Sequence, residues 1–212
     1  MGIIMTTKEL RPRQKNDFYP TPYELVRAGL EKIEYEIPYP RNVLDPGAGN
    51  GVWGREVRRL WSAAPIMGIE IDPTFAKPSV YERWNVVDYL DKDVSGVTFD
   101  LIVGNPPYRQ AERFIRKSFE LLEPKGHIFF LLRLAMLESQ RRAKGLWQEH
   151  RPKKVYVLGR RPSFTGNGKT DATAYALYLW QKGWQGETTL DWLMWDYDDE
   201  REEPPTLRRE MP

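Results

Sequence analysis

The stretch Val43-Leu44-Asp45-Pro46-Gly47-Ala48-Gly49-Asn50-Gly51 combines a short apolar strand, a glycine-rich turn and the start of a helix. Glycines let a backbone approach a ligand closely because they carry no Cβ, and the N–H groups at a helix start can hold an anionic group. The glycine spacing differs from the dinucleotide-binding fingerprint, and no phosphate-binding lysine follows. The stretch therefore predicts a ligand-binding turn between a strand and a helix.

Strand and helix patterns alternate over most of the chain around this turn. Residues 127–132 form a continuous apolar run, typical of a strand buried on both faces, whereas residues 110–122 have their apolar positions at helical spacing. Strands are expected at 41–45, 66–71, 85–87, 101–104, 127–132, 155–158 and 172–180, and helices at 52–61, 110–122 and 135–150. This alternation predicts an α/β fold with a largely parallel sheet.

Acidic residues follow two of the expected strands. Glu70 ends the strand at 66–71, and Asp88 and Tyr89 follow the strand at 85–87. Each acid alone is typical of a loop or a helix cap, but the carboxyl ends of neighbouring parallel strands meet at one edge of a sheet, where ribose hydroxyls are commonly bound. Together with the glycine-rich turn they predict a cofactor crevice.

The tetrad Asn105-Pro106-Pro107-Tyr108 directly follows the apolar run at 99–104. The two prolines fix φ and cannot continue a strand ladder, so the chain leaves the sheet rigidly. The Asn105 side chain offers an acceptor oxygen, and Tyr108 offers a flat face for stacking a planar substrate. An ordinary turn after a strand would also explain the tetrad alone.

Composition excludes several kinds of chemistry. The chain has 212 residues and no cysteine, so disulfides, thiolate metal sites and cysteine nucleophiles are absent. Its two histidines, His127 and His150, are too few for a histidine-based metal centre, and we expect no metal. No apolar segment approaches the roughly 20 residues that span a membrane, which predicts a cytoplasmic protein.

Charge is unevenly distributed, although the net charge is only +2. The segment 133–161 is strongly basic, whereas the segment 196–203 is acidic. A basic block beside the tetrad suits a nucleic-acid backbone, and a solvated helix face is the alternative explanation.

These segments resemble the class I S-adenosylmethionine-dependent methyltransferases, and among them the phage and prophage enzymes that modify the N6 amine of adenine in DNA. The resemblance covers roughly residues 17–182. It is carried by Asp17-Phe18-Tyr19-Pro20-Thr21-Pro22, Asp45-Pro46-Gly47-Ala48-Gly49, Glu70, Asp88, the tetrad and the loop Arg161-Pro162-Ser163-Phe164-Thr165-Gly166-Asn167-Gly168-Lys169-Thr170-Asp171. It implies a Rossmann-like, mostly parallel sheet of seven strands, the last antiparallel, with helices on both faces.

The resemblance also implies the cofactor site, with S-adenosylmethionine bound and S-adenosylhomocysteine as the product. Glu70 would bind the ribose, Ile71 would pack on the adenine, and Asp88 and Tyr89 would contact its edge, with Asn105 beside the methyl group. The methionine part would lie against residues of the first two motifs, namely Tyr19, Thr21, Pro22, Asp45, Pro46, Gly47, Ala48 and Gly49.

For the acceptor, the resemblance implies an adenine flipped out of the duplex. Its amine is a poor nucleophile because the lone pair is delocalised into the ring, and hydrogen bonds to Asn105 and to the Pro106 carbonyl would localise and aim it. Pro107 would keep this segment rigid, Tyr108 would stack on the base, and Phe164 would lie on its other side or in the core. Substrate contacts are further expected from the basic side chains Arg133, Arg141, Arg142 and Lys169.

The expected domain organisation is a mobile segment at 1–16, a catalytic domain at 17–196 and an acidic tail at 197–212, in a bacterial or phage-infected host. The chain has no room for a separate target-recognition domain, so loops, a homodimer or a partner subunit would read the sequence. Trp184, Trp192 and Trp195 would be buried, cover an interface or form a small hairpin. The alternatives are an N6-adenine RNA methyltransferase, a protein glutamine N5-methyltransferase, and a silent nucleic-acid-binding fold.

Overall fold

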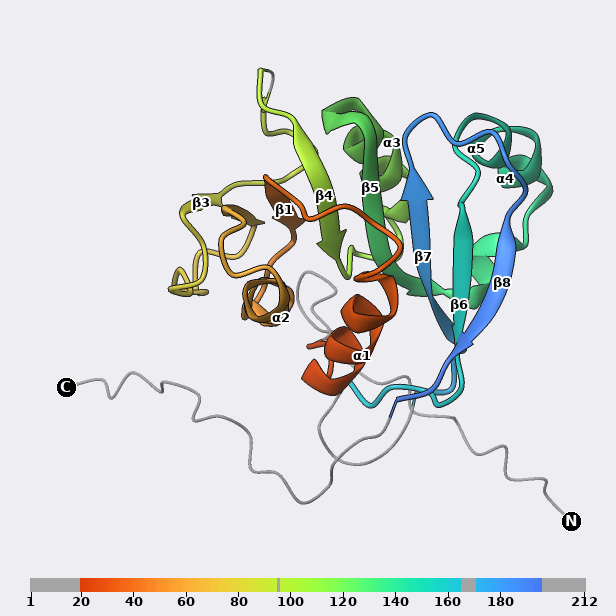
Figure 1. Cartoon of the computed structure of the whole chain (residues 1–212), viewed down its shortest axis with the longest axis horizontal. Coiled ribbons are helices and arrows are strands. Elements are labelled where there is room, and N and C mark those ends of the chain that lie inside the picture. The colour runs from red at the N-terminus through yellow and green to blue at the C-terminus, as the bar shows by residue number, and fades with distance from the viewer. Residues whose placement is uncertain (1–19, 95, 165–170, 196–212) are drawn as a thin grey trace, which may run out of the picture.

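The computed structural model describes residues 20–94, 96–164 and 171–195 of the chain (Figure 1). The predicted segments at 1–16 and 197–212, and the predicted site residues Tyr19 and Lys169, lie outside the described residues. In the described part, no helix is both long and apolar enough to cross a membrane.

Helices and strands alternate as the sequence predicts. The strands are β1 (Val43–Pro46), β2 (Ile66–Glu70), β3 (Arg83–Val86), β4 (Phe99–Gly104), β5 (Leu122–Arg133), β6 (Lys154–Leu158), β7 (Tyr175–Gln181) and β8 (Thr189–Leu193). The helices are α1 (Tyr23–Ile33), α2 (Val52–Leu60), α3 (Ala111–Leu121), the 3-10 helix η2 (Leu134–Leu137), α4 (Gln140–Lys144) and α5 (Leu146–Glu149).

The strands of the described chain form a single sheet in the order β3-β2-β1-β4-β5-β7-β6-β8. Strand β7 is antiparallel to both of its neighbours, β5 and β6, and every other pairing in the sheet is parallel. The predicted number of seven strands is therefore too low by one, because β8 adds an edge strand beside β6. The predicted α/β fold with a mostly parallel sheet is confirmed.

The extra strand β8 explains part of the tryptophan-rich segment. It does not form a hairpin with β7 but crosses to the far side of β6 and runs parallel to it. Trp195, just beyond β8, is buried, whereas Trp192 is 60% exposed. Of the alternatives for these tryptophans, burial holds for Trp195, and a hairpin with β7 does not form because β8 pairs with β6.

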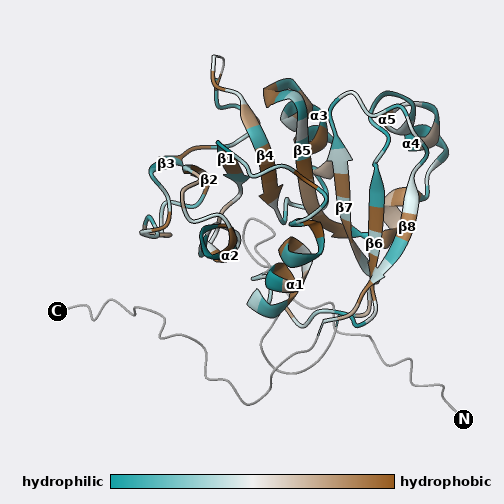
Figure 2. Ribbon diagram, viewed as in Figure 1, coloured by the Kyte–Doolittle hydropathy of each residue, from teal (hydrophilic) through white to brown (hydrophobic). Residues whose placement is uncertain are grey.

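Apolar side chains cover both faces of the sheet, so the core has two layers. Helices α1 and α2 pack on one face, and α3 and α5 pack on the other (Figure 1). Figure 2 shows hydrophobic segments in the central strands β4 and β5, in agreement with the burial of most of β4 and of residues 126–132 of β5. Helix α1, which the sequence analysis did not predict, buries Leu25, Val26, Leu30 and Ile33.

The helix predicted at 135–150 is broken into three short pieces. Ser139 accepts a hydrogen bond from the Arg142 amide and so caps α4, and Gly145 separates α4 from α5 with φ −115° and ψ −94°. These angles lie outside the helical range. The local signals of a cap and a glycine thus prevail over the basic, helix-like composition.

Candidate functional site

A cavity of about 380 Å³ opens at the carboxyl ends of β1, β2 and β4, where the sequence predicts a cofactor crevice. Of the predicted site residues, the structure brings Thr21, Gly47, Ala48, Gly49, Glu70, Ile71, Asp88, Tyr89, Asn105 and Pro107 to its wall. The predicted residues Pro22, Asp45, Pro46, Pro106 and Tyr108 are not among those that line it. A volume of this size suits a ligand of nucleoside dimensions.

Hydrogen bonds to β2 hold the glycine-rich turn in place. The amides of Gly47 and Ala48 donate to the Ile69 carbonyl at 2.7 and 3.0 Å, which holds the turn against the next strand. Gly47 has φ +91°, and a Cβ built on it would meet nothing within 4 Å. The turn therefore uses a left-handed conformation that favours glycine and presents open space to the cavity.

Glu70 links the turn to the end of β2. One oxygen of its carboxylate accepts from the Gly49 amide at 2.7 Å, and the other accepts from the Asp72 amide at 2.9 Å. The residue is only 6% exposed, and two backbone donors compensate for burial of its charge. Each carboxylate oxygen has a second lone pair, so Glu70 can also accept from a ligand hydroxyl.

Asp45 lies beneath the cavity rather than on its wall. It is completely buried, and its Oδ2 accepts a hydrogen bond from the Tyr81 hydroxyl at 2.7 Å. Burial, with a smaller contribution from the charge of Glu70, raises the pKa of Asp45 to about 7. A direct ligand contact was predicted for Asp45; in the structure its side chain is buried, hydrogen-bonded to Tyr81, and not among those that line the cavity.

The far end of the cavity is lined mainly by apolar side chains. Ile71 is 48% exposed and shares this end with Phe75, Val87 and Phe114. Tyr89 contributes only ring atoms, because its hydroxyl is hydrogen-bonded to Ser118 on α3 at 3.0 Å. This end suits a planar, largely apolar ring.

The tetrad lies at the opposite end of the cavity. The Asn105 amide nitrogen donates to the Thr21 hydroxyl at 3.1 Å, and both residues line the cavity. This hydrogen bond assigns the nitrogen end of the amide to Thr21 and leaves the carbonyl end as the acceptor. Asn105 and Thr21 are 84 positions apart in the sequence, so the fold brings two of the predicted motifs together.

An aromatic cluster adjoins the tetrad and consists of Tyr108, Tyr175 and Phe164. The ring of Tyr108 lies 5.4 Å from that of Tyr175, which in turn lies 5.2 Å from that of Phe164 in an edge-on arrangement. The Arg133 guanidinium carbon lies 5.0 Å from the centre of the Tyr108 ring. Burial raises the pKa of the Tyr108 hydroxyl, which faces the side chains of Asn105 and Tyr175.

Phe164 is only 4% exposed and belongs to the core layer on the α1 side. Of the two positions considered for Phe164, beside the base or in the core, the structure has the core position. Its edge-on contact with Tyr175 explains this, since a buried aromatic pair gains packing that an exposed ring lacks.

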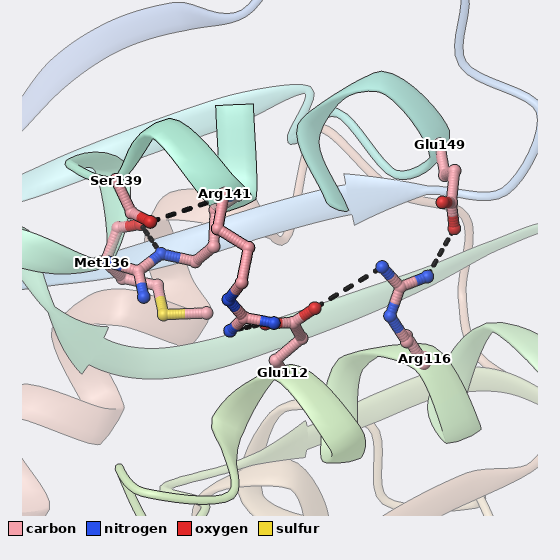
Figure 3. A network of polar contacts seen from close by, with 7 residues as sticks. Glu112, Arg116, Met136, Ser139, Arg141 and Glu149 are labelled. Carbon is pink, nitrogen blue, oxygen red and sulfur yellow. Dashed lines mark hydrogen bonds and ion pairs between the residues drawn. The ribbon is translucent and has the colours of Figure 1, made fainter. Parts of the chain in front are cut away.

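Two of the predicted DNA-contacting arginines are held by this protein's own groups. Figure 3 shows Glu112 between Arg141 and Arg116, with Glu149 on the other side of Arg116. Arg142 donates to the carbonyls of Met136 at 2.8 Å and Ala135 at 3.1 Å, and also to that of Glu138. Arg142 therefore stabilises the turn before α4.

Several residues at the site were not predicted from the sequence. Phe75 and Phe114 line the apolar end, Tyr81 holds Asp45, and Tyr175 joins the tetrad to Phe164. Phe75 and Tyr81 lie in an irregular segment with no periodic signal. Phe114 and Tyr175 do carry a periodic signal, because they lie in the predicted helix at 110–122 and the predicted strand at 172–180.

No protein-family model matches the chain. A Type II methyltransferase, M.CvrRI, of Paramecium bursaria Chlorella virus XZ-6E is 31% identical over 107 residues, which cover 48% of this chain and 27% of that protein. The tRNA1(Val) (adenine(37)-N6)-methyltransferase of Porphyromonas gingivalis is 27% identical over 141 residues, covering 50% of this chain and 53% of that protein. The chain thus spans about half or less of the curated relatives that it matches.

Solved structures resemble the whole described domain. A type I restriction-modification methyltransferase subunit from Streptococcus thermophilus superposes with a TM-score of 0.65 at 15% identity, covering 79% of this chain and 45% of that one. A Listeria monocytogenes chain, provisionally assigned to the class I S-adenosylmethionine-dependent methyltransferases, gives a TM-score of 0.63 at 14% identity, covering 84% and 66%. The chain therefore has the class I methyltransferase fold.

Proposed function

We propose that this protein transfers a methyl group from S-adenosylmethionine to the N6 amine of an adenine flipped out of DNA. The observation that carries the proposal is the position of Asn105, which lines the cavity, is hydrogen-bonded to Thr21 and adjoins Tyr108. At this point the Asn105 amide would lie between the cofactor and the acceptor. Both the curated relatives and the solved neighbours include methyltransferases, which supports the reaction type.

The residues of the cavity fit S-adenosylmethionine. Its apolar end, with Ile71 and Phe75, suits the adenine, and Glu70 can accept from ribose hydroxyls. The open space at Gly47 admits the methionine part close to the backbone. When bound, this cofactor supplies a methyl group on a positively charged sulfur, so no covalent intermediate with the protein is required.

Asn105 and Pro106 would then act on the acceptor amine. Hydrogen bonds from the amine to the Asn105 side-chain oxygen and to the Pro106 carbonyl localise its lone pair and point it along the cavity. The Thr21 hydroxyl orients the Asn105 amide for this role, and the two prolines hold the backbone rigid. Orientation and electrostatic complementarity account for the rate, without a nucleophilic side chain.

Tyr108 would stack on the flipped base, because an adenine inside a duplex cannot present its amine in this way. Arg133 is the predicted phosphate contact that lies nearest to Tyr108. Lys169 remains a predicted contact on the loop after Phe164. Recognition of a target sequence is proposed to depend on loops, a second copy of the chain or a partner subunit. One of the solved neighbours is itself a subunit of a type I restriction-modification system.

RNA is the second candidate acceptor, and one observation favours it. The relative from Porphyromonas gingivalis acts on an adenine of tRNA, and it aligns over half of this chain. The relative from the Chlorella virus is a Type II methyltransferase with the higher identity, which favours DNA. The chemistry at Asn105 is the same for both acceptors, so the site geometry alone serves either.

Transfer of radiolabelled methyl from S-adenosylmethionine tests the proposal, with unmethylated genomic DNA, total RNA and bulk protein as parallel acceptors. We expect label in DNA, recovered as N6-methyladenine after digestion to nucleosides. Label found only in RNA would select the second candidate. Label in protein glutamine, or no transfer by a protein that binds the cofactor, would overturn the proposal.

A further inference from the structure

Arg133 has an anchored backbone and an exposed side chain. It ends β5, where its register partner on β7 is Tyr175. Its carbonyl accepts from the Tyr178 hydroxyl at 3.1 Å, and the next amide, that of Leu134, donates to the Ala174 carbonyl at 2.9 Å. The side chain is exposed and reaches from this anchored point toward the tetrad.

The guanidinium of Arg133 covers the Tyr108 ring. Its carbon lies 5.0 Å from the ring centre, and the guanidinium also lies beside the Tyr175 side chain. The Tyr108 hydroxyl points inward, to Asn105 and Tyr175. The ring face beneath Arg133 is therefore a flat surface directly beside Asn105.

The neighbouring arginines are held differently. Arg141 pairs with Glu112, and Arg142 donates to three backbone carbonyls. Within the described ranges, no carboxylate lies within ion-pair distance of Arg133. Arg133 therefore has a cation–π contact with the Tyr108 ring and a polar contact with the Tyr175 side chain, both at an exposed position where a phosphate can replace them.

We propose that Arg133 occupies the base-stacking face of Tyr108 while no DNA is bound and moves from it to a phosphate beside the flipped adenine. This inference rests on the proposed function. A planar guanidinium stacks on an aromatic face much as a base does, which makes it a suitable substitute for the missing adenine. The same group pairs well with a phosphate, so on DNA binding Arg133 exchanges the Tyr108 ring for a phosphate, which binds it more strongly.

Arg133 is thus a positioning residue that covers the stacking face of Tyr108 before the base arrives. The proposal requires two opposite consequences of removing the guanidinium. A free nucleoside should bind more tightly, because nothing has to leave the ring. Duplex DNA should bind more weakly, because a phosphate contact is lost.

Equilibrium dialysis with labelled adenosine and fluorescence anisotropy with a mixed-sequence duplex measure the two consequences. Saturating S-adenosylhomocysteine fills the cofactor cavity in both experiments, so that adenosine reports only on the acceptor side. The variants are Arg133→Ala and Arg133→Lys, the latter keeping the charge without the planar group. Arg41→Ala is the matched control, because Arg41 is an exposed cation beside the amino end of β1, paired with Asp100.

For Arg133→Ala we expect about two- to fivefold tighter adenosine binding, the factor that a weak cation–π contact represents. We expect weaker duplex binding, with the slope of log K against log salt reduced by about 0.9. Arg133→Lys should keep the salt slope and still bind adenosine more tightly than wild type. Arg41→Ala should leave adenosine binding unchanged.

Weaker binding of both ligands by Arg133→Ala would mean that Arg133 only supports the fold. Unchanged adenosine binding with weaker DNA binding would make it a plain phosphate contact. Either result overturns the inference while wild-type methyl transfer to DNA still stands. If the wild type transfers no methyl to DNA, the proposed function itself fails, and the two failures are therefore distinguishable.

Discussion

The two ends of the site are built in different ways. The proposed cofactor end is held mainly by main-chain amides: those of Gly47 and Ala48 donate to the Ile69 carbonyl, and that of Gly49 donates to the Glu70 carboxylate. The proposed acceptor end is held by side chains, through the contacts among Tyr108, Tyr175, Phe164 and Arg133. Backbone contacts follow from local sequence and strand order, whereas side-chain packing depends on residues far apart in the chain.

The largest expected effect comes from Asn105, where the two ends meet. Asn105→Ala should lower kcat/KM for methyl transfer by about 1,000-fold, because a preorganised acceptor for the reacting amine is lost. The affinity for S-adenosylhomocysteine, measured by calorimetry, should stay within about twofold of wild type, because the turn and Glu70 are untouched.

Asn105→Asp sharpens this result, because it keeps an acceptor oxygen but no longer donates to Thr21. We expect its activity to lie between those of wild type and Asn105→Ala. If Asn105→Ala keeps more than a tenth of the wild-type rate, Asn105 is not the hydrogen-bond acceptor for the reacting amine.

Phe164 tests whether the acceptor end is a packed core or a substrate surface. Phe164→Ala should lower the free energy of unfolding by about 3 kcal/mol, the cost of truncating a buried phenylalanine. Phe164→Leu, which keeps more volume, should cost less. Urea unfolding of both variants provides the measurement, and methyl transfer per folded molecule should change little for Phe164→Leu.

The opposite pattern would move Phe164 into the substrate site. A Phe164→Leu protein with wild-type stability but a raised KM for DNA would show that the ring contacts the base. The edge-on contact with Tyr175 would then be a resting arrangement only.

The cofactor end should respond more moderately, because several groups share the ligand. Glu70→Gln keeps the size of the side chain but loses its charge and one of its acceptor oxygens. We expect about 10- to 100-fold weaker binding of S-adenosylhomocysteine, a typical loss for a charged hydrogen-bonding partner. Calorimetry measures it, and duplex binding without cofactor is the internal control.

An equal loss of cofactor and duplex affinity in Glu70→Gln would contradict the separation of the two ends. It would mean that Glu70 acts by supporting the whole domain through Gly49 and Asp72.

The α/β fold and the cofactor end could be predicted because their signals are local. The strand at Val43–Pro46, the glycines after it and the acid at Glu70 each occupy a few adjacent positions. Strand order then brings them together without further information. The eighth strand was missed because β8 is an edge strand whose pairing with β6 depends on a crossover that the sequence does not signal.

The acceptor end could be predicted only in part. The tetrad is a local signal, but the position of Phe164 depends on Tyr175, which lies on a different strand. Arg141 and Arg142 looked alike as basic residues, yet a carboxylate on α3 and three nearby carbonyls hold them. Composition identifies the charges but not their partners.

Asp45 gives the smallest expected effect. It lies below both ends of the site, and its Oδ1 is only 3.3 Å from where a Cβ on Gly104 would be. Burial raises its pKa from an ordinary value near 3.8 to about 7. Between those values the folded state keeps a proton that the unfolded state releases, so the stability due to Asp45 falls as pH rises through about 7. From pH 6 to 8 the loss is about 1.4 kcal/mol.

Asp45→Asn should lack this pH dependence, because an amide does not titrate. The measurement is the wild-type minus variant free energy of unfolding, by urea, at pH 6 and pH 8. Burial lowers the pKa values of His127 and His150, so both histidines also titrate on unfolding. They are present in both proteins and cancel in the difference. A difference that is constant with pH would show that Asp45 is ionised in the folded protein. The Tyr81 hydroxyl would then donate to a buried carboxylate rather than to a neutral carboxyl group.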